Sequence, residues 1–231
     1  MERYGNVDIL YEDNHILVVN KPAGMLSQGD KTGDDSILDV LKAYIKEKYH
    51  KPGNVFLGSV HRLDRPVSGV MVFARTSKAL TRLTKALKER KIKKRYYAIV
   101  EGVVKDTEGK LVHHLLKDKG NNTVKAFARE GKNTKEAALN YKVKGVAGGF
   151  TLLDIDLITG RPHQIRVQLA AALFPIAGDV KYGSKHRFAD KNICLHSYNL
   201  SFMHPVRKEE MNFVYYPGAS RCIWERFKKF F

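Results

Sequence analysis

The chain has 231 residues, and its hydrophobic content of 43% is sufficient for one compact domain with a buried core. It carries 41 Lys and Arg residues against 24 Asp and Glu residues, a formal net charge of +17 at pH 7. A surplus of this size is typical of a protein that binds a polyanion such as nucleic acid. An anionic membrane surface is the second candidate partner, and a surface kept basic for solubility is the third explanation.

The two cysteines, Cys194 and Cys222, form no Cys-x-x-Cys pair, which excludes a zinc ribbon or a redox motif. We expect both to be small buried side chains in a reducing compartment. The longest uncharged apolar stretch, residues 169–178, has about half of the roughly 20 residues that a membrane helix needs. No signal-peptide core follows Met1, so we expect a cytoplasmic protein without a membrane partner.

The first half of the chain combines strand-like runs with two helices. Ser36 and Asp39 have the spacing of a capping box, and apolar residues recur behind them at helical intervals. Lys21–Gly24 has the composition of a turn. We predict strands over 15–19, 70–74 and 96–100, and helices over 34–49 and from Thr76 or Ser77 to about Leu87.

The second half is richer in strands. Leu153, Ile155 and Leu157 alternate with acidic residues, a pattern typical of a half-buried strand. We predict hairpin strands and mobile loops over 104–134 with a turn at Gly120–Asn122, a helix over 162–173 with Pro162 near its first turn, a strand over 193–202, and a closing helix. The apolar stripe of that helix, from Ile223 to Phe231, favours docking on its own domain over membrane binding. Together these elements indicate an α+β fold with a largely antiparallel sheet.

The first segment that could carry chemistry is the polar loop Gly58–Gly69. It places Asp64 close to His61, Arg62 and Arg65. Because a nearby positive charge lowers the pKa of a carboxyl group, Asp64 is expected to be ionised, and an ionised Asp can act as a nucleophile. Taken alone, an Asp that pairs with Arg to fix a loop is the more common explanation.

The second segment, Thr159–Gln168, gathers Arg161, His163, Gln164 and Arg166 where a strand leads into a helix. Backbone N–H groups at such a junction favour anions, which predicts phosphate binding. The alternative is a helix whose polar face meets solvent. Since Ile165 and Arg166 should not both face the core, Arg166 requires either water or a carboxylate partner.

The third segment is the basic stretch Arg75–Arg95, in which ten of 21 residues are Lys or Arg and Glu89 is the one acid. Phosphate contact and a solvated helix face explain it equally well. Tyr96 and Tyr97 follow, and either could stack on a base or occupy the core. The nine histidines show no spacing typical of metal ligands, and no nucleotide-binding glycine motif occurs, so we expect no metal and no cofactor.

The order of these motifs along the chain is more informative than any one of them. The chain resembles the RluA family of pseudouridine synthases over about residues 7–205. The resemblance rests on the motifs His61–Asp64, Ser68–Gly69, Lys94–Ala98, Thr159–Arg161 and His163–Arg166, and on the flanking pieces Asn20–Gly24, Gly178–Asp179, Tyr182–Gly183 and Leu195–His196.

The resemblance implies a central, mostly antiparallel mixed sheet with helices and loops around an active-site cleft. It implies that residues 1–231 form a single catalytic domain without a separate N-terminal RNA-binding domain. The implied activity is isomerisation of uridine to pseudouridine in RNA, without metal or cofactor, by a protein that we expect to be a monomer. Ribosomal RNA is the favoured substrate and transfer RNA the alternative; a non-catalytic RNA-binding or ribosome-assembly factor is the competing function.

The resemblance also implies residue roles. Asp64 matches the catalytic aspartate, Tyr96 the tyrosine that lies against the target base, and Arg166 the arginine paired with that aspartate. Arg62 matches an arginine implicated in base flipping, as expected for an enzyme that must extrude its target base. His61, Arg161, His163 and Gln164 are the further expected RNA-binding residues. Val67 and Gln168 depart from the common pattern of the family.

Overall fold

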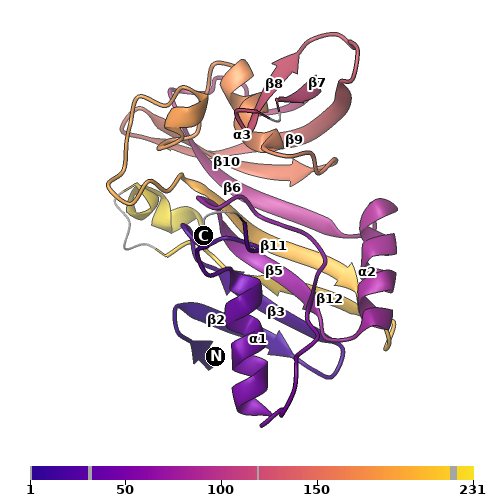
Figure 1. Cartoon of the computed structure of the whole chain (residues 1–231). Coiled ribbons are helices and arrows are strands. Elements are labelled where there is room, and N and C mark those ends of the chain that lie inside the picture. Colours follow the sequence, from indigo (N-terminus) through magenta and orange to yellow (C-terminus); the bar gives the residue numbers. More distant parts are fainter. Residues whose placement is uncertain (1, 31–32, 119, 219–222) are drawn as a thin grey trace. The chain divides into compact units, whose positions relative to one another are not determined.

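The computed structural model describes residues 2–30, 33–118, 120–218 and 223–231. They form two compact units, one of residues 1–93 and 197–215 and the other of residues 94–196 and 216–231 (Figure 1). Each unit combines an antiparallel sheet with helices, so the expected α+β class is confirmed.

The sheet of the first unit follows the order β1-β2-β3-β5-β11, with β12 on β11 and β4 on β5. The strands predicted over 15–19 and 70–74 are confirmed as β3 and β5, which pair in register from Ile16 opposite Ala74 to Lys21 opposite Gly69. The strand bounds are β1 Glu2–Tyr4, β2 Val7–Glu12, β3 Ile16–Lys21, β4 Gly58–Ser59, β5 Ser68–Ala74, β11 Leu195–Met203 and β12 Glu210–Val214.

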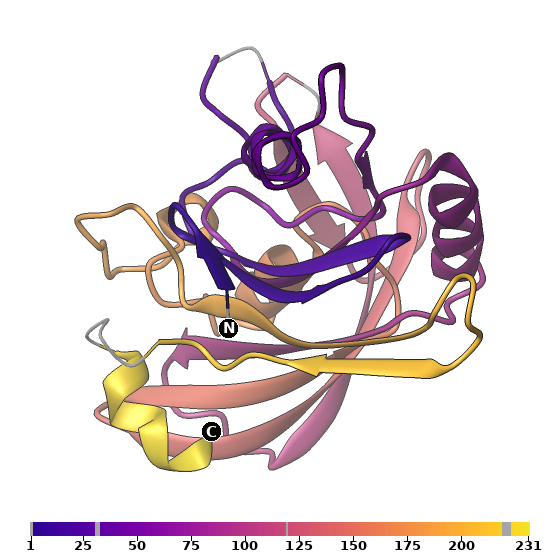
Figure 2. The ribbon, with the colours of Figure 1, turned by 90° about the horizontal axis from the view of Figure 1, so that it is seen from below.

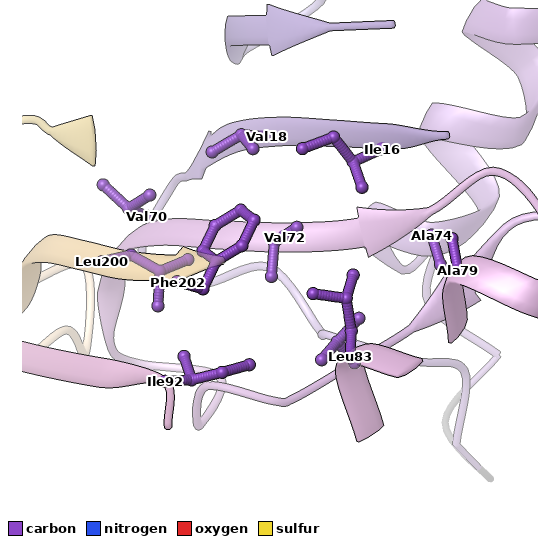
Figure 3. Close-up of a cluster of buried hydrophobic side chains, with 11 residues drawn as sticks. Ile16, Val18, Val70, Val72, Ala74, Ala79, Leu83, Ile92, Leu200 and Phe202 are labelled. Atoms are coloured by element: carbon purple, nitrogen blue, oxygen red, sulfur yellow. The ribbon is translucent and has the colours of Figure 1, made fainter. Parts of the chain in front are cut away.

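One face of this sheet packs against α2 (Ser77–Lys88). Alternate side chains of β3 and β5 point to this face, and Ala79 and Leu83 of α2 pack against them (Figure 3). Thr76 is the N-cap of α2, where its side-chain oxygen accepts the N–H of Ala79 at 3.2 Å. The predicted choice between Thr76 and Ser77 is thereby resolved, and such a cap contributes about 1 kcal/mol.

The other helix of the unit, α1 (Ile37–Lys48), lies across β2 and β3 (Figure 2). The predicted capping box is present, since Ser36 and Asp39 each accept the other's backbone N–H. At the far end of the helix, Tyr44 and Lys48 donate to Glu12 at 2.7 and 3.0 Å. These bonds attach the helix to the end of β2.

The second unit has the strand order β6-β10-β9-β7-β8. The hairpin expected within residues 104–134 is confirmed as β7 and β8. The bounds are β6 Lys93–Glu101, β7 Glu108–Asp118, β8 Thr123–Phe127, β9 Lys135–Ala147 and β10 Phe150–Leu157. The prediction of a half-buried strand is wrong for most of β10, because Asp154 is buried and pairs with Arg95 at 2.6 Å.

Two helical segments complete the second unit besides the short turn η1 (Val180–Tyr182). The helix α3 (Gln164–Ala171) begins after Pro162, so Pro162 precedes the helix and does not lie in its first turn. The closing segment is a 3₁₀ helix, η2 (Trp224–Phe230), which packs on β9, where a Cβ at Gly145 would overlap the Phe230 ring. The expected docking of this segment on its own domain is therefore confirmed.

Cys194 is buried, as predicted, whereas Cys222 lies outside the described residues. Within the described part of the chain, no helix is long and apolar enough to cross a membrane.

Candidate active site

Asp64 lies in the loop between β4 and β5, and its side chain is only partly buried. The residue before it is held by Ser27, whose Oγ accepts the N–H of Leu63 at 3.0 Å and donates to its carbonyl at 2.6 Å. The residue after it is held by Gly24, whose N–H donates to the Arg65 carbonyl at 2.8 Å. The backbone is therefore fixed on both sides of Asp64, and the carboxylate is presented from a rigid loop.

Lys21, the last residue of β3, places a buried amino group against this loop. Its side chain is fully buried, and Nζ donates to the carbonyls of Pro22, Met25 and Arg65 at 2.9, 2.8 and 3.3 Å. Burial lowers the pKa of Lys21 to about 7, and the negative charge of Asp64 opposes this shift. Three carbonyl acceptors match the three N–H donors of an ammonium group, so Lys21 ties the segment after β3 to the Asp64 loop.

The basic residues next to Asp64 in sequence differ in their exposure to solvent and in their partners. Arg65 forms its ion pair with Asp34 at 2.7 Å and donates from Nε to the Gly24 carbonyl at 3.0 Å. Arg62 is exposed to solvent, and His61 is buried with Nε2 accepting the Val72 N–H at 3.3 Å. Arg65 therefore also joins the Asp64 loop to Asp34, which is distant in sequence.

The Ser68–Gly69 motif has a steric explanation. Gly69 has a φ of +129°, and a Cβ at this position would overlap the backbone of Ser197 on β11. Glycine is the residue that tolerates both conditions. The motif therefore allows β5 to leave the Asp64 loop and lie directly against β11.

In the second unit, Arg166 and Asp179 form a buried two-point ion pair. Nε lies 2.7 Å from Oδ2 and Nη2 lies 2.8 Å from Oδ1, and both side chains are about as buried as core residues. The guanidinium carbon also lies 5.0 Å from the centre of the Tyr182 ring. The expectation that Ile165 and Arg166 cannot both face inward is wrong, because both are buried; the expected carboxylate partner of Arg166 exists and is Asp179.

Gln164 holds the turn that precedes α3. Its Oε1 accepts from Thr159 at 2.7 Å and from the N–H of Arg161 at 3.0 Å, and its Nε2 donates to the Ala138 carbonyl at 3.1 Å. The side chain is buried. These bonds fix the direction in which the chain enters α3, through His163 in a left-handed conformation with a φ of 50°.

Arg161 and His163 differ in their surroundings. The Arg161 side chain donates from Nε to the Glu136 carbonyl at 3.1 Å near the surface. His163 Nδ1 lies 2.7 Å from the Tyr182 hydroxyl, which also accepts the N–H of Val124 at 3.0 Å. Tyr182 therefore joins the turn before α3 to the β8 strand.

The two neighbouring tyrosines of β6 point to opposite sides of the sheet. Tyr96 lies opposite Ile155 and is buried. Tyr97 stacks against Tyr216 and lies 5.2 Å, centre to centre, from the Phe231 ring. Tyr97 is therefore part of an aromatic cluster at the end of the chain, which leaves Tyr96 as the candidate for contact with a base.

The predicted site residues fall into two groups. The first unit holds His61, Arg62 and Asp64, and the second holds Tyr96, Arg161, His163, Gln164 and Arg166. Sequence reasoning assigned no role to Lys21, Ser27 or Asp179. Lys21 and Asp179 belong to the motifs Asn20–Gly24 and Gly178–Asp179 that carry the family resemblance, and these motifs could have drawn attention to them. No motif in the sequence marks Ser27.

Comparison with known proteins gives a consistent result. The model of the RNA pseudouridylate synthase family matches residues 15–171. Ribosomal large subunit pseudouridine synthase C of Buchnera aphidicola (subsp. Baizongia pistaciae) is 36% identical over 217 residues, which cover 88% of this chain and 64% of the relative. An uncharacterized RNA pseudouridine synthase of Bacillus subtilis is 34% identical, with 89% of this chain and 67% of the relative covered.

Ribosomal large subunit pseudouridine synthase D of Neisseria meningitidis (serogroup A) is 37% identical over 90% of this chain and 57% of its own length. The chain thus spans about six-tenths of the length of such relatives. Among solved structures, human RNA pseudouridylate synthase domain containing 4 is similar in fold, with a TM-score of 0.76 and 24% identity over 91% of this chain and 88% of that one. The expected fold and family are confirmed: the chain belongs to the RNA pseudouridylate synthase family.

Proposed function

We propose that this protein isomerises uridine to pseudouridine in structured RNA, with Asp64 as the catalytic nucleophile. The observation that carries the proposal is the Asp64 loop, in which a partly exposed carboxylate stands between two backbone positions clamped by Ser27 and Gly24. Ribosomal RNA is the favoured substrate, because relatives of this chain carry names that refer to the large ribosomal subunit. Transfer RNA remains the alternative substrate.

The reaction needs no redox step and no external energy. The bond between N1 of the base and C1′ of the ribose breaks, the base rotates, and a bond forms between C5 and C1′. The proton on C5 leaves to solvent and N1 gains a proton, so substrate and product are isomers. A carboxylate such as Asp64 can support this exchange by attack on, or deprotonation of, the ribose while the base turns.

The remaining site residues divide the other tasks. In this proposal Arg62, exposed beside the Asp64 loop, takes part in base flipping, and Tyr96 lies against the flipped base and assists proton removal at C5. Arg166 acts as the arginine partner of the catalytic carboxylate and is itself oriented by Asp179. Arg161 and His163 contact the RNA backbone. Gln164 acts indirectly, because its hydrogen bonds hold the turn that carries them.

The test is release of tritium from RNA labelled at uridine C5. We expect Asp64→Ala and Asp64→Asn to abolish release while RNA binding is retained, and we expect the exposed control Asp35→Ala to behave as the wild type. Normal release by Asp64→Asn would exclude the nucleophile role. Wild-type protein that binds RNA without releasing tritium from any cellular RNA fraction would favour the non-catalytic RNA-binding factor.

A further inference from the structure

The structure divides the basic stretch Arg75–Arg95 into three residues that are paired with strands or partly buried and seven that are exposed on or after α2. At its ends, Arg75 pairs with the largely buried Glu12 at 2.8 Å and Arg95 pairs with Asp154 at 2.6 Å. Lys94 is partly buried, and burial lowers its pKa. The other seven are exposed and together are called the α2 basic face: Lys78, Arg82, Lys85, Lys88, Arg90, Lys91 and Lys93.

Helix geometry brings the helical members of this face together. At 3.6 residues per turn, Lys78, Arg82 and Lys85 fall within an arc of about 60°, with neighbouring side chains about 5–6 Å apart. Ala79 and Leu83 lie on a different side of the helix and pack into the core of the first unit (Figure 3). The basic side chains therefore project away from the sheet as a continuous row.

The charges of the α2 basic face are not balanced by the described residues of the chain. Glu89 is its one acidic neighbour in sequence, and it lies 2.8 Å from Lys91 and 3.8 Å from Lys85, all three being exposed. Such exposed pairs contribute little. No ion pair reaches Lys78, Lys88, Arg90 or Lys93 within the part of the chain that the structure describes.

Lys85 and Lys88 lie in the last turn of α2, where positive charge is favourable, but the rest of the arrangement does not serve the stability of the helix. The first turn of α2 has no acidic residue, although acidic residues are favourable there. Lys78 and Arg82 are four residues apart and Arg82 and Lys85 three, so like charges repel by about 0.2–0.5 kcal/mol per pair. A surface kept basic for solubility does not require such a row either, since α1 in the same unit mixes Asp39 and Glu47 with its lysines. A row of like charges that repel one another indicates a ligand of opposite charge.

The neighbouring side chains identify the kind of ligand. A helix that binds a membrane surface presents apolar residues beside its basic ones, but Leu80 and Leu87 pack against the core and the exposed face is polar. Single-stranded RNA is bound through aromatic side chains that stack on bases, and residues 77–93 contain none. What the row can bind is a regular array of phosphates.

We propose that the α2 basic face docks the phosphate backbone of a base-paired RNA segment that neighbours the target uridine. This inference rests on the proposed function for the identity of the polyanion as RNA. The contact is independent of sequence, because phosphates carry no base information. The face contains none of the predicted site residues, so the enzyme grips the substrate at a place where it performs no chemistry.

The test compares two triple substitutions in the full chain. The first is Lys78→Gln, Lys85→Gln and Lys88→Gln, which spares Arg82 because Arg82 also donates to the Pro205 carbonyl at 2.7 Å. The matched control is Lys42→Gln, Lys46→Gln and Lys51→Gln, which removes the same charge from α1 and the residues after it. Affinity for a labelled mixed-sequence RNA duplex is measured between about 0.05 and 0.2 M salt, where binding by phosphate contacts is steeply salt-dependent.

Log K falls as log salt rises, and we expect this negative slope to be shallower by about 2–3 in the α2 variant. We expect binding to be weaker by up to about 100-fold near 0.1 M salt. We expect it to unfold at about the same denaturant concentration as the wild type, since the relieved repulsion and the lost interaction of Lys85 and Lys88 with the helix C-terminus oppose each other. Equal slopes for the two triple variants would overturn the docking surface. So would an α2 variant that loses binding to phosphatidylserine vesicles, or to single-stranded oligouridylate, but not to the duplex.

Catalysis is measured separately with RNA labelled at uridine C5. At saturating RNA the α2 variant should release tritium at the wild-type rate, because the substituted lysines do not touch the reacting base. Failure of the wild type to release tritium contradicts the proposed function, whereas unchanged duplex binding by the α2 variant contradicts only the docking surface. The two failures are therefore distinguishable.

Discussion

The buried pair of Arg166 and Asp179 allows a quantitative prediction. Replacing Asp179 by Leu removes the two bonds that its carboxylate accepts from the Arg166 guanidinium, which is 5% exposed. Removal of one partner from a buried ion pair costs about 3–5 kcal/mol, because the remaining charge stays desolvated. With about 2–4 °C per kcal/mol for a chain of this size, we expect Tm to fall by about 6–20 °C.

The assay is thermal unfolding for Tm and urea unfolding for the free energy, both followed by tryptophan fluorescence. Trp224 is the single tryptophan of the chain, is buried, and belongs to the same unit as the pair, so its signal reports the unit that the substitution affects. Asp179→Leu, Arg166→Met and the double variant form a cycle in which the double variant buries two apolar side chains and no charge. We expect the double variant to be more stable than the sum of the single effects implies, by about 2–3 kcal/mol. Additivity within about 0.5 kcal/mol would show that the two charges are not coupled and would refute this reasoning.

Three further predictions concern the first unit. Burial lowers the pKa of Lys21 from 10.5 to about 7, so between these pH values the folded state binds fewer protons than the unfolded state. The free energy of unfolding should therefore rise from about pH 7 to 10.5, as a penalty of order 4–5 kcal/mol is relieved. Lys21→Met should lose this rise, so the difference in unfolding free energy between wild type and variant should change with pH. A pH-independent difference, measured by circular dichroism, would contradict the burial of a charge. Gly69→Ala should lower the unfolding midpoint strongly because its Cβ overlaps backbone, whereas Gly53→Ala, in open space, should not; equal midpoints would contradict the close approach of β5 and β11. Ser27→Ala removes both hydrogen bonds to Leu63 and should reduce kcat for tritium release about tenfold with RNA affinity retained, and an unchanged kcat would show that the clamp does not position Asp64.

The elements that could be predicted are those whose signals are local. Ser36 and Asp39 lie three residues apart, and both bonds of the capping box form between them in the structure. Thr76 is likewise followed by a helical pattern that starts within one turn. Such interactions involve neighbours in sequence and depend little on the rest of the chain, and the capping residues of α1 and α2 were predicted for this reason.

The surroundings of Asp64 could not be predicted from its neighbours in sequence. Arg65, next to Asp64, forms an ion pair with the distant Asp34, and the buried Lys21 that bonds to the loop is the last residue of β3. The composition of the loop gives the number of charges, whereas the fold decides which of them meet. The alternation in β10 was misleading for the same reason: Asp154 lies in a polar position of the pattern, but Arg95 on β6 allows it to be buried.

The basic stretch shows what the fold adds to a charge count. By sequence alone, ten basic residues in 21 are equivalent, and phosphate contact is as good an explanation as solvation. In the structure, Arg75 and Arg95 are tied to Glu12 and Asp154, so their removal would destabilise strands and mimic a loss of RNA binding. The lysines between them, such as Lys78, lie on a helix that packs through its other side and can lose their charge without loss of core contacts. Only substitutions in the middle of the stretch can therefore separate RNA docking from folding, and a variant that removes the whole run would answer neither question.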